Sequence, residues 1–491
     1  MLEVKGPDRP ATISPDLVVE GGRTGAPAST VEVPGDKSVT HRALLAALLP
    51  GAPHRLTIRN ANLGGAVRAL FPALRALGLD TLVEGDVLTV RRAAPAPQPV
   101  RPHPAITRWP EGIPYLETAG SSAAARLLIG VLAGAGRGAV VDGDEVLRHR
   151  PMDWIVTPLN ELGADIRYLG RSGRLPVSVG GRVHRSRRVE LAVGSAQARS
   201  AVLLGAVAAG VPAELRHPVR SRDHTERMLA AFGARLTEGP GRVVYDGGPC
   251  SVPPLIDVPG DPSLAAYPVA AHLLRGGGGE LRIPDVCLNP TRTGFFDVLR
   301  RAGAAIDYQD LRTTAGGEPV GTVVTTAGLD GVRAVTVDDP ETLHALIDEV
   351  PLLAVVAARL PGTSRIGCAG ELRFKETDRL VTTARMAAAF GARVHVEPDG
   401  LTVNGPRAVD GPPPGGTTGL STGLSTGLSA GLSARTVPGF EDHRIAMAAA
   451  TLATALPGRT TITGGACHTT SFPGFTAVLR AVGAAIHEVT L

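Results

Sequence analysis

The stretch VLRRAGAAIDY, residues 298–308, has the pattern of a helix that ends at Gly303 and leads directly into a strand. Glycine ends a helix readily because it adopts a left-handed backbone without a steric penalty. The same pattern recurs at LRALGLD (74–80), LNELGADIRYL (159–169), MLAAFGARLT (228–237), MAAAFGARVHV (386–396) and VLRAVGAAIHEV (478–489). Helix–glycine–strand turns are common in α/β proteins, so coincidence is the alternative. Recurrence at similar intervals instead indicates one supersecondary unit copied six times, which favours two domains of three units.

Composition and charge predict a soluble protein. The 491-residue chain has 43% hydrophobic and 20% charged residues, enough for a sizeable core. A formal net charge of +4 and 3% aromatic residues argue against a dedicated nucleic-acid binder. The N-terminus has no apolar secretory segment, and the longest apolar stretch, 201–211, is too short to span a bilayer. The four cysteines have no C-x-x-C spacing. We therefore expect a cytoplasmic protein that binds no metal, nucleic acid or membrane.

Two segments are expected to lie outside the packed repeats. The Pro-rich stretch AAPAPQPVRPHPAITRWP (93–110) is typical of a surface loop. The stretch TTGLSTGLSTGLSAGLSA (417–434) is a four-residue low-complexity repeat. We interpret it as part of a disordered insertion over 411–435, because such a composition has little reason to pack.

Polar side chains crowd the expected starts of two buried helices. VPGDKSVTHRAL (33–44) places Lys37, Ser38 and Arg42 ahead of an apolar run, and GELRFKETDRL (370–380) places Lys375 beside Glu376. Helix N-termini attract anions, and these side chains add charge and hydrogen-bond donors. Apart from Lys5 these are the only lysines in the chain. Because lysine, unlike arginine, can release its proton, the pattern suggests proton transfer. Ordinary N-caps followed by solvated charges are the alternative.

Further helix starts carry the same residue types. They are LRHRPMDWI (147–155), AVGSAQARSAVLL (192–204), SRDHTERML (221–229), HALIDEVPLLAVVAA (344–358) and FEDHRIAMAAA (440–450). Asp348 and Glu349 fall in an apolar stretch, where buried carboxylates need cationic or hydrogen-bonding partners. For His224 and His443 a simple capping role is the alternative. Together these segments imply a pocket for ligands with several phosphate or carboxylate groups, and no G-x-G-x-x-G or P-loop motif is present.

On these residues the chain, from about residue 30 onward, resembles the 5-enolpyruvylshikimate-3-phosphate (EPSP) synthase family. The motifs that carry the resemblance, in the family's order, are PGDKSVTHRA, RPM, SAQARSA, SRDHTERML, VPGDPSLAA, LNPTRTG, IDEVPLLA, ELRFKETDR, DHRIAM and TSFPGF. They are most similar to the glyphosate-tolerant branch. The resemblance implies an α/β fold of two lobes, each with three βαβαββ repeats, helices inside and sheets outside.

The resemblance also implies how the chain divides between the lobes. A discontinuous lobe of residues 1–34 and 256–491 carries Asp348 and the Lys375–Arg379 and Asp442–Arg444 motifs. The lobe of residues 35–255 carries the Lys37–Arg42, Arg150 and Ser195–Gln197 motifs. Closure of the cleft between them would expel water.

The implied reaction moves the enolpyruvyl group of phosphoenolpyruvate to the 5-hydroxyl of shikimate 3-phosphate. It passes through a tetrahedral ketal phosphate and releases phosphate without a metal or cofactor. By resemblance, Lys37 and Glu376 handle protonation of the methylene carbon, and Asp348 takes the hydroxyl proton. The implied phosphoenolpyruvate-binding residues are Lys37, Ser122, Arg150, Gln197, Arg379 and Arg444. The implied acceptor-binding residues are Lys37, Ser38, Arg42, Ser195, Ala196, Gln197, Ser221, Arg222, Asp348 and Lys375.

Two segments depart from the family pattern and keep alternatives open. GSSA, at 120–123, stands where N-[SA]-G-T is usual, and without a gap Ser122 takes the place of a glycine that lies against phosphoenolpyruvate. ANLGGAV, at 61–67, stands where an acidic segment is expected, which puts the acceptor in question. The alternatives are a relative that uses another phosphorylated acceptor, such as the nucleoside monophosphate UMP, and an inactive paralogue that only binds anions. We expect a monomer.

Overall fold

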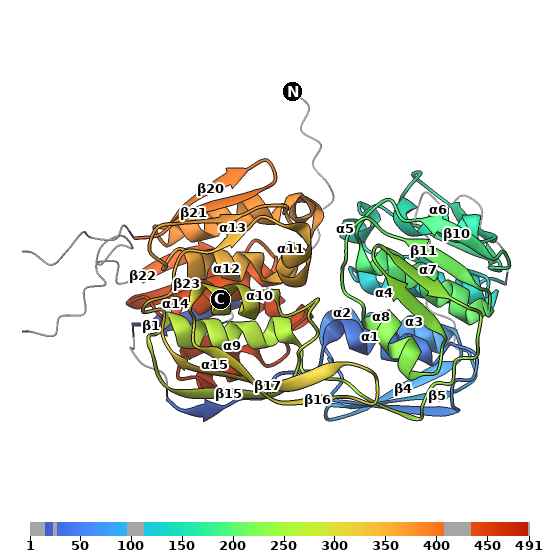
Figure 1. Ribbon diagram of the computed structural model, residues 1–491, viewed down its shortest axis with the longest axis horizontal. Helices are drawn as coiled ribbons and strands as arrows, with labels where there is room; N and C mark the ends of the chain where they lie inside the picture. Colours follow the sequence, from blue (N-terminus) through green and yellow to red (C-terminus); the bar gives the residue numbers. More distant parts are fainter. Residues whose placement is uncertain (1–14, 23–26, 96–111, 407–433, 490–491) are drawn as a thin grey trace, which may run out of the picture.

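The computed structural model describes residues 15–22, 27–95, 112–406 and 434–489, which form two lobes (Figure 1). The predicted loop at 93–110 and the predicted insertion at 411–435 fall almost entirely outside the described residues and stay predictions. In the described part of the chain, no helix combines the length and apolarity that a membrane span requires.

The repeating unit is visible in the segment that starts at β10 (Arg187–Glu190) and ends at β13 (Arg242–Tyr245). Between these strands the chain forms α7 (Ala196–Ala209), β11 (Ala213–Arg216), α8 (His224–Ala231) and β12 (Leu236–Gly239), so the order is βαβαββ. The sheet order is β10-β11-β13-β12, with β10 parallel to β11 and the other pairs antiparallel. All six four-stranded sheets of the described chain share this pattern of one parallel pair and two antiparallel pairs.

Three of these sheets form the first lobe. Besides the segment above, its strands are β3 (Arg55–Arg59), β4 (Leu79–Glu84), β5 (Val87–Arg92), β6 (Tyr115–Glu117), β7 (Ala139–Asp142), β8 (Ala164–Tyr168), β9 (Val177–Gly181) and β14 (Leu255–Asp257). Its other helices are α1 (Lys37–Ala46), α2 (Gly65–Arg68), α3 (Phe71–Ala76), α4 (Ser122–Ala135), α5 (Glu145–Arg148) and α6 (Asp153–Glu161).

The other three sheets form the second lobe. Its strands are β1 (Asp16–Gly21), β2 (Ser29–Thr30), β15 (Gly277–Cys287), β16 (Ile306–Thr313), β17 (Pro319–Ala327), β18 (Thr336–Val337), β19 (Thr363–Ile366), β20 (Arg393–Glu397), β21 (Gly400–Asn404), β22 (Ala434–Pro438), β23 (Gly458–Thr463) and β24 (Ala485–Val489). Its helices are α9 (Pro262–Leu274), α10 (Gly294–Ala302), α11 (Pro340–Leu346), α12 (Val350–Ala357), α13 (Arg379–Ala389), α14 (His443–Ala453) and α15 (Phe475–Ala481), with short 3₁₀ turns η1 (Ile347–Glu349), η2 (Gly370–Phe374) and η3 (Gly465–Thr470).

The predicted glycine turns all form. Each of the six glycines has a positive φ, between 81° at Gly78 and 108° at Gly303, and each leads into an edge strand of one sheet. These strands are β4, β8, β12, β16, β20 and β24. The helix-stopping conformation that only glycine adopts cheaply therefore sets the start of the edge strand in all six units.

The helices lie inside each lobe, as predicted. In the first lobe α4 and α7 pack so closely that a Cβ atom added at Gly130 would lie 2.1 Å from the Ala201 carbonyl oxygen, and one at Gly134 would lie 2.1 Å from the Gly205 carbonyl oxygen. In the second lobe α9, α12 and α14 are buried along almost their whole length. Each lobe has its own hydrophobic core, and the outer faces of the sheets meet solvent.

The chain passes between the lobes twice, and both passages read VPGD, at 33–36 and 258–261. They run antiparallel and pair through Gly35 and Gly260. The Asp36 N–H donates to the Pro259 carbonyl oxygen at 2.7 Å, and the Asp261 N–H donates to the Pro34 carbonyl oxygen at 3.0 Å. The two crossings therefore form one hydrogen-bonded hinge directly before α1 and α9.

Candidate active site

Three helix N-termini, those of α1, α13 and α14, lie close together where the two lobes meet. The Asp36 carboxylate caps α1 by accepting from the backbone N–H groups of Ser38, at 2.7 Å, and Val39, at 2.9 Å. Asp378 caps α13 and Asp442 caps α14 in the same way. The crowded polar motifs of the sequence thus combine ordinary caps, whose carboxylates satisfy free N–H groups, with a cation in the first turn of each helix: Lys37, Arg379 and Arg444.

Lys37, the first residue of α1, belongs to the first lobe but is surrounded by charges of the second. Burial and the Arg444 guanidinium lower the pKa of its ammonium group, while Asp348 and Glu376 act in the opposite direction. The Lys37 backbone N–H also donates to Asp261 Oδ2 at 3.1 Å. A buried lysine with a lowered pKa releases its proton more readily than a solvated one.

Asp348, in η1, lies among three arginines. Its carboxylate oxygens are 2.6 Å from Arg222 Nη2, 3.3 Å from Arg379 Nη1 and 4.0 Å from Arg444 Nη2. Burial raises the pKa of the carboxyl group, but Arg222 and Arg444, the strongest of the neighbouring cations, outweigh burial and hold the pKa well below its usual range. Asp348 is therefore an ionised carboxylate at neutral pH, and the Arg222 pair joins the two lobes.

Glu376 forms the second ion pair between the lobes. Its carboxylate lies 3.2 Å from Arg150 Nη2 of the first lobe and also pairs closely with Arg379. Burial raises the Glu376 pKa, but the neighbouring cations, Arg379 first and Arg150 among them, outweigh burial and leave the pKa well below its usual range. Arg379 is itself held by Asp442 at 2.9 Å.

His443, the first residue of α14, is a site residue that the sequence did not separate from a simple cap. Burial lowers its pKa to about 3, and Glu376, Arg444 and Lys37 are the next strongest influences. The imidazole is therefore neutral at neutral pH and lies within the same charged group.

The first-lobe wall of the cleft is a set of hydrogen-bonded cations. Arg150 Nη1 donates to Ser122 Oγ at 3.2 Å, and Arg126 Nη1 donates to Gln197 Oε1 at 2.7 Å. Arg126 also stacks over the ring of Trp154, with 5.4 Å to the centroid. Burial and the Arg150 charge lower the Arg126 pKa to about 10. Arg126 was missing from the predicted site, although the GSSAAAR segment carries it.

A cavity of 460 Å³ opens beside these residues and has walls from both lobes. Arg150 and Trp154 line one side, and Phe374, Lys375 and Glu376 line the other. Lys375 also forms an ion pair with Glu371, four residues earlier. Arg150, Lys375 and Glu376 line this cavity, and Lys37 and Asp348 belong to the same cluster of interacting charges.

Several predicted acceptor residues lie at helix starts nearby. Ser195 caps α7 through Oγ, which accepts from the Ala198 N–H at 3.4 Å, and Ala196 is the first residue of that helix. Ser38 occupies the second position of α1. At both helix starts a cap occupies a backbone N–H group: the Ser38 N–H donates to Asp36 Oδ1, and the Ala198 N–H donates to Ser195 Oγ.

Arg42 occupies a different place. It is buried behind the start of α1 and donates to Thr225 Oγ1 at 2.6 Å, Ser200 Oγ at 2.7 Å and the Ser38 carbonyl oxygen at 2.8 Å. In this arrangement its guanidinium supports the helix start and is occupied by protein groups.

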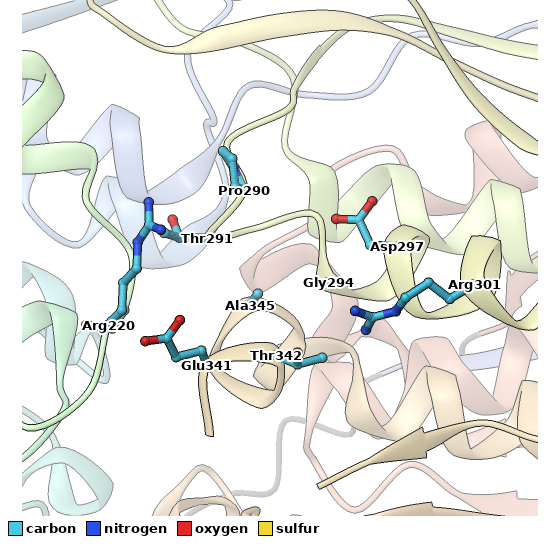
Figure 2. Close-up of a pocket in the computed structure, with 10 residues that line it drawn as sticks. Arg220, Pro290, Thr291, Gly294, Asp297, Arg301, Glu341, Thr342 and Ala345 are labelled. Carbon is cyan, nitrogen blue, oxygen red and sulfur yellow. The ribbon is translucent and has the colours of Figure 1, made fainter. Parts of the chain in front are cut away.

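Ser221 lines a second cavity between the lobes, with a volume of 220 Å³. Figure 2 shows Arg220 on one side of this cavity and Arg301 on the other, with Glu341 pointing toward Arg220. Within the described structure the Ser221 hydroxyl is buried and has no hydrogen-bond partner.

Comparisons with known proteins agree with this geometry. The family model described as "EPSP synthase (3-phosphoshikimate 1-carboxyvinyltransferase)" matches residues 24–479. A 3-phosphoshikimate 1-carboxyvinyltransferase of Desulforudis audaxviator is 36% identical over 452 residues, which cover 92% of this chain and 96% of the relative. The enzyme of the same name from Acidiphilium cryptum is 38% identical over 462 residues, covering 93% and 95%. The solved EPSP synthase of Acinetobacter baumannii superposes with a TM-score of 0.77 at 29% identity and covers 97% of this chain and 100% of its own.

The predicted inside-out α/β fold, the predicted family and the prediction of an enzyme are thereby confirmed. With six four-stranded sheets of one topology among its described residues, arranged in two lobes with a cluster of charges between them, this chain belongs to the EPSP synthase (3-phosphoshikimate 1-carboxyvinyltransferase) family.

Proposed function

We propose that this chain transfers the enolpyruvyl group of phosphoenolpyruvate to the 5-hydroxyl of shikimate 3-phosphate and releases phosphate. The observation that supports this most directly is the position of Lys37, whose pKa is influenced by Arg444, Asp348 and Glu376 of the other lobe. A proton donor and two carboxylates are the groups that an addition–elimination at a vinyl carbon needs.

In the addition step Lys37 gives its proton to the methylene carbon of phosphoenolpyruvate. Asp348, held ionised by its arginines, takes the proton of the acceptor hydroxyl, whose oxygen bonds to the neighbouring carbon. The product of this step is a tetrahedral ketal phosphate with a new methyl group.

In the elimination step the bond from that carbon to the phosphate oxygen breaks. The Glu376 carboxylate removes a proton from the methyl group, so the double bond re-forms in the product. The proton on Glu376 returns to Lys37, and the one on Asp348 leaves with the phosphate. Both carboxylates suit this role because their lowered pKa values keep them ionised before the reaction.

The arginines of the cleft supply the binding charge. Arg150, Arg379 and Arg444 would hold the phosphoenolpyruvate anion, while Ser38, Ser195 and Lys375 would hold the acceptor phosphate. Arg150 and Arg379 now pair with Glu376. The substrate anions would therefore take over cations whose charge is already balanced within the protein, in a partly dry cleft where such contacts are strong.

The test is a steady-state assay of phosphate release from phosphoenolpyruvate with separate acceptors. Turnover with shikimate 3-phosphate and none with UMP supports the proposal. Turnover with UMP alone would assign the other phosphorylated acceptor. Tight phosphoenolpyruvate binding without turnover on either acceptor would identify an anion-binding paralogue.

We also propose that the chain belongs to the glyphosate-tolerant branch of the family. The support is Ser122, whose hydroxyl accepts a hydrogen bond from Arg150 at 3.2 Å, at a position where the family usually has glycine. A side chain there narrows the space beside the phosphoenolpyruvate site, and glyphosate is longer, by one bond between phosphorus and carboxyl carbon, than the substrate it displaces. Ser122→Gly should lower the inhibition constant for glyphosate more than the KM for phosphoenolpyruvate, and parallel changes would contradict this.

We further propose that the protein works as a cytoplasmic monomer. Sedimentation at the mass of a single chain, with full activity at that state, tests the oligomeric part of this proposal.

A further inference from the structure

A single buried arginine ties the two inter-lobe crossings together. Arg292, from the LNPTRTG motif, is 3% exposed. Its Nη1 donates to Asp36 Oδ2, and its Nη2 donates to Asp261 Oδ1 at 2.8 Å and to Ser263 Oγ at 3.0 Å. One guanidinium therefore joins the aspartates of both VPGD segments, which cap the first helix of each lobe.

The guanidinium is fixed from its other side as well. Arg292 Nη1 lies 3.1 Å from His224 Nε2, and His224 Nδ1 lies 2.8 Å from Glu318 Oε1. Because Arg292 can only donate, Nε2 accepts and Nδ1 carries the proton that Glu318 receives. His224, Cys287 and Glu318 are close enough together to resemble a metal site. A metal at Nδ1 would displace that proton while a guanidinium faces Nε2, so hydrogen bonding accounts for this group better.

The two aspartates also bracket the backbone of Lys37. Asp36 directly precedes Lys37 and caps its helix, whereas Asp261 Oδ2 accepts the Lys37 N–H at 3.1 Å from the other lobe. Asp261 thus uses one carboxylate oxygen for Arg292 and the other for Lys37. This links the guanidinium to the start of α1 through one side chain of each lobe.

We propose that Arg292 is a positioning residue for the reaction: by joining Asp36 and Asp261 it holds Lys37 in register with Asp348 and Glu376 without touching either substrate. The assignment rests on the proposed function, because it gives Lys37 the proton-transfer role. Errors of about 1 Å in the placement of a reacting group cost on the order of a hundredfold in rate.

Electrostatics explain why a cation is needed at this point. Asp36 is 0% and Asp261 2% exposed, so without a guanidinium two buried carboxylates would face each other. Burial disfavours the charge on Arg292, but Asp36 and Asp261 outweigh burial and raise its pKa further above the ordinary value. The Arg292 guanidinium therefore stays charged over the whole working range of pH.

The sharpest test is the isosteric change Asp261→Asn. The amide oxygen can still accept from Arg292 and from the Ser263 N–H, which now donates to Oδ1 at 2.9 Å, so α9 keeps its cap. The amide nitrogen would face the Lys37 N–H, and that hydrogen bond is lost. We expect kcat to fall by about ten- to a hundredfold while both KM values change by less than about threefold. The ratio of kcat in H₂O to kcat in D₂O should rise, because proton transfer from Lys37 becomes more strongly rate-limiting.

Two further variants and one control complete the design. Asp36→Asn places an amide against Arg292 from the other side. The double variant Asp36→Asn/Asp261→Asn should lower kcat by about as much as either single change does, since the residues act as a unit. Asp142→Asn is the control: Asp142 is equally buried and pairs with Arg148 at 2.7 Å, but lies in β7, apart from Lys37. The control should lower thermal stability and leave kcat and the isotope effect unchanged.

The proposal predicts different results for Asp261→Asn and for the control. A fall in kcat for the control that matches Asp261→Asn, or an unchanged isotope effect in Asp261→Asn, would overturn the proposal. Backbone hydrogen exchange gives a readout that needs no turnover: the Lys37 amide should exchange at least about tenfold faster in Asp261→Asn than in the wild type. If the wild type proves inactive, the proposed function fails independently of this inference. Unchanged hydrogen exchange at Lys37 in Asp261→Asn would still reject the positioning role of Arg292.

Discussion

Replacing Lys37 with methionine removes the ammonium group and keeps an unbranched side chain of similar length. The structure indicates that no neighbour can take over its proton. Asp348 and Glu376 are held ionised by their arginines. The imidazole of His443, with a pKa lowered to about 3, is neutral, and a guanidinium such as that of Arg444 does not release its proton.

The expected loss in rate follows from this arrangement. A positioned general acid contributes roughly 10²–10⁴-fold, which corresponds to about 3–5 kcal/mol at 1.36 kcal/mol per tenfold change. Loss of the positive charge beside an anionic substrate adds to that. We therefore expect kcat of Lys37→Met to fall by at least about a thousandfold.

Stability should change in the opposite direction. Burial and Arg444 lower the Lys37 pKa in the folded state, so the charged lysine is less favourable folded than unfolded. This cost is fully present below the folded pKa and is lost as the pH rises from the folded pKa to the higher unfolded pKa. Removing the ammonium group at pH 7 should therefore leave the melting temperature unchanged or raise it.

The assay is steady-state phosphate release with phosphoenolpyruvate and shikimate 3-phosphate, together with thermal unfolding of each variant. Lys37→Arg is the matched control, because it keeps the charge but cannot release a proton. It should bind phosphoenolpyruvate nearly as well as the wild type and turn over as poorly as Lys37→Met. Activity within about tenfold of the wild type in either variant would refute the role of Lys37, and a lower melting temperature for Lys37→Met would refute the electrostatic reasoning.

Three further predictions concern the acceptor site, the hinge and acid stability. Lys375→Ala should raise the acceptor KM by about tenfold, the equivalent of a charged hydrogen bond, with little change in kcat; an unchanged KM would argue against this site. Gly35→Ala should unfold at a lower temperature than the wild type, because the added Cβ would lie 1.7 Å from the Asn60 carbonyl oxygen. An equal melting temperature would show that the backbone of the two crossings can shift to accommodate the methyl group. Because the Asp348 pKa is held below its usual 3.8, the stability it contributes is present above that value and is lost as the pH falls through its folded pKa. Asp348→Asn should accordingly flatten the fall in melting temperature below about pH 4, and identical pH profiles would exclude this contribution.

The repeat was readable from the sequence because its signal is local. A helix followed by glycine and an alternating run is specified within about ten residues, as at Gly303 and Gly391, and both turns formed as predicted. The strand pairings that complete the sheets could not be predicted in this way. β14 pairs with β3, and β2 pairs with β15, across long stretches of chain, and no local pattern encodes such partners.

The same contrast between local signals and long-range contacts applies to the residues of the candidate site. Lys37, Asp348 and Glu376 were predicted from motifs, and the structure brings them together, although their roles remain predictions. Arg292 was overlooked because LNPTRTG was read only as a family motif. The repeated VPGD was the available signal, since two buried aspartates at equivalent crossings need a shared cation.

The pairing of β1 has a consequence for synthesis. β1 lies between β23 and β24, and Asp16 Oδ1 accepts the Gly464 N–H across a sequence separation of 448 residues. At roughly 5–20 residues per second on the ribosome, β1 waits on the order of tens of seconds for its partners. The first lobe has all its strands once β14 has emerged, so it can fold while the second is unfinished. During translation, therefore, the nascent chain presents an unpaired β1 beside a completed neighbour, and this strand is the segment on which chaperone protection would matter most.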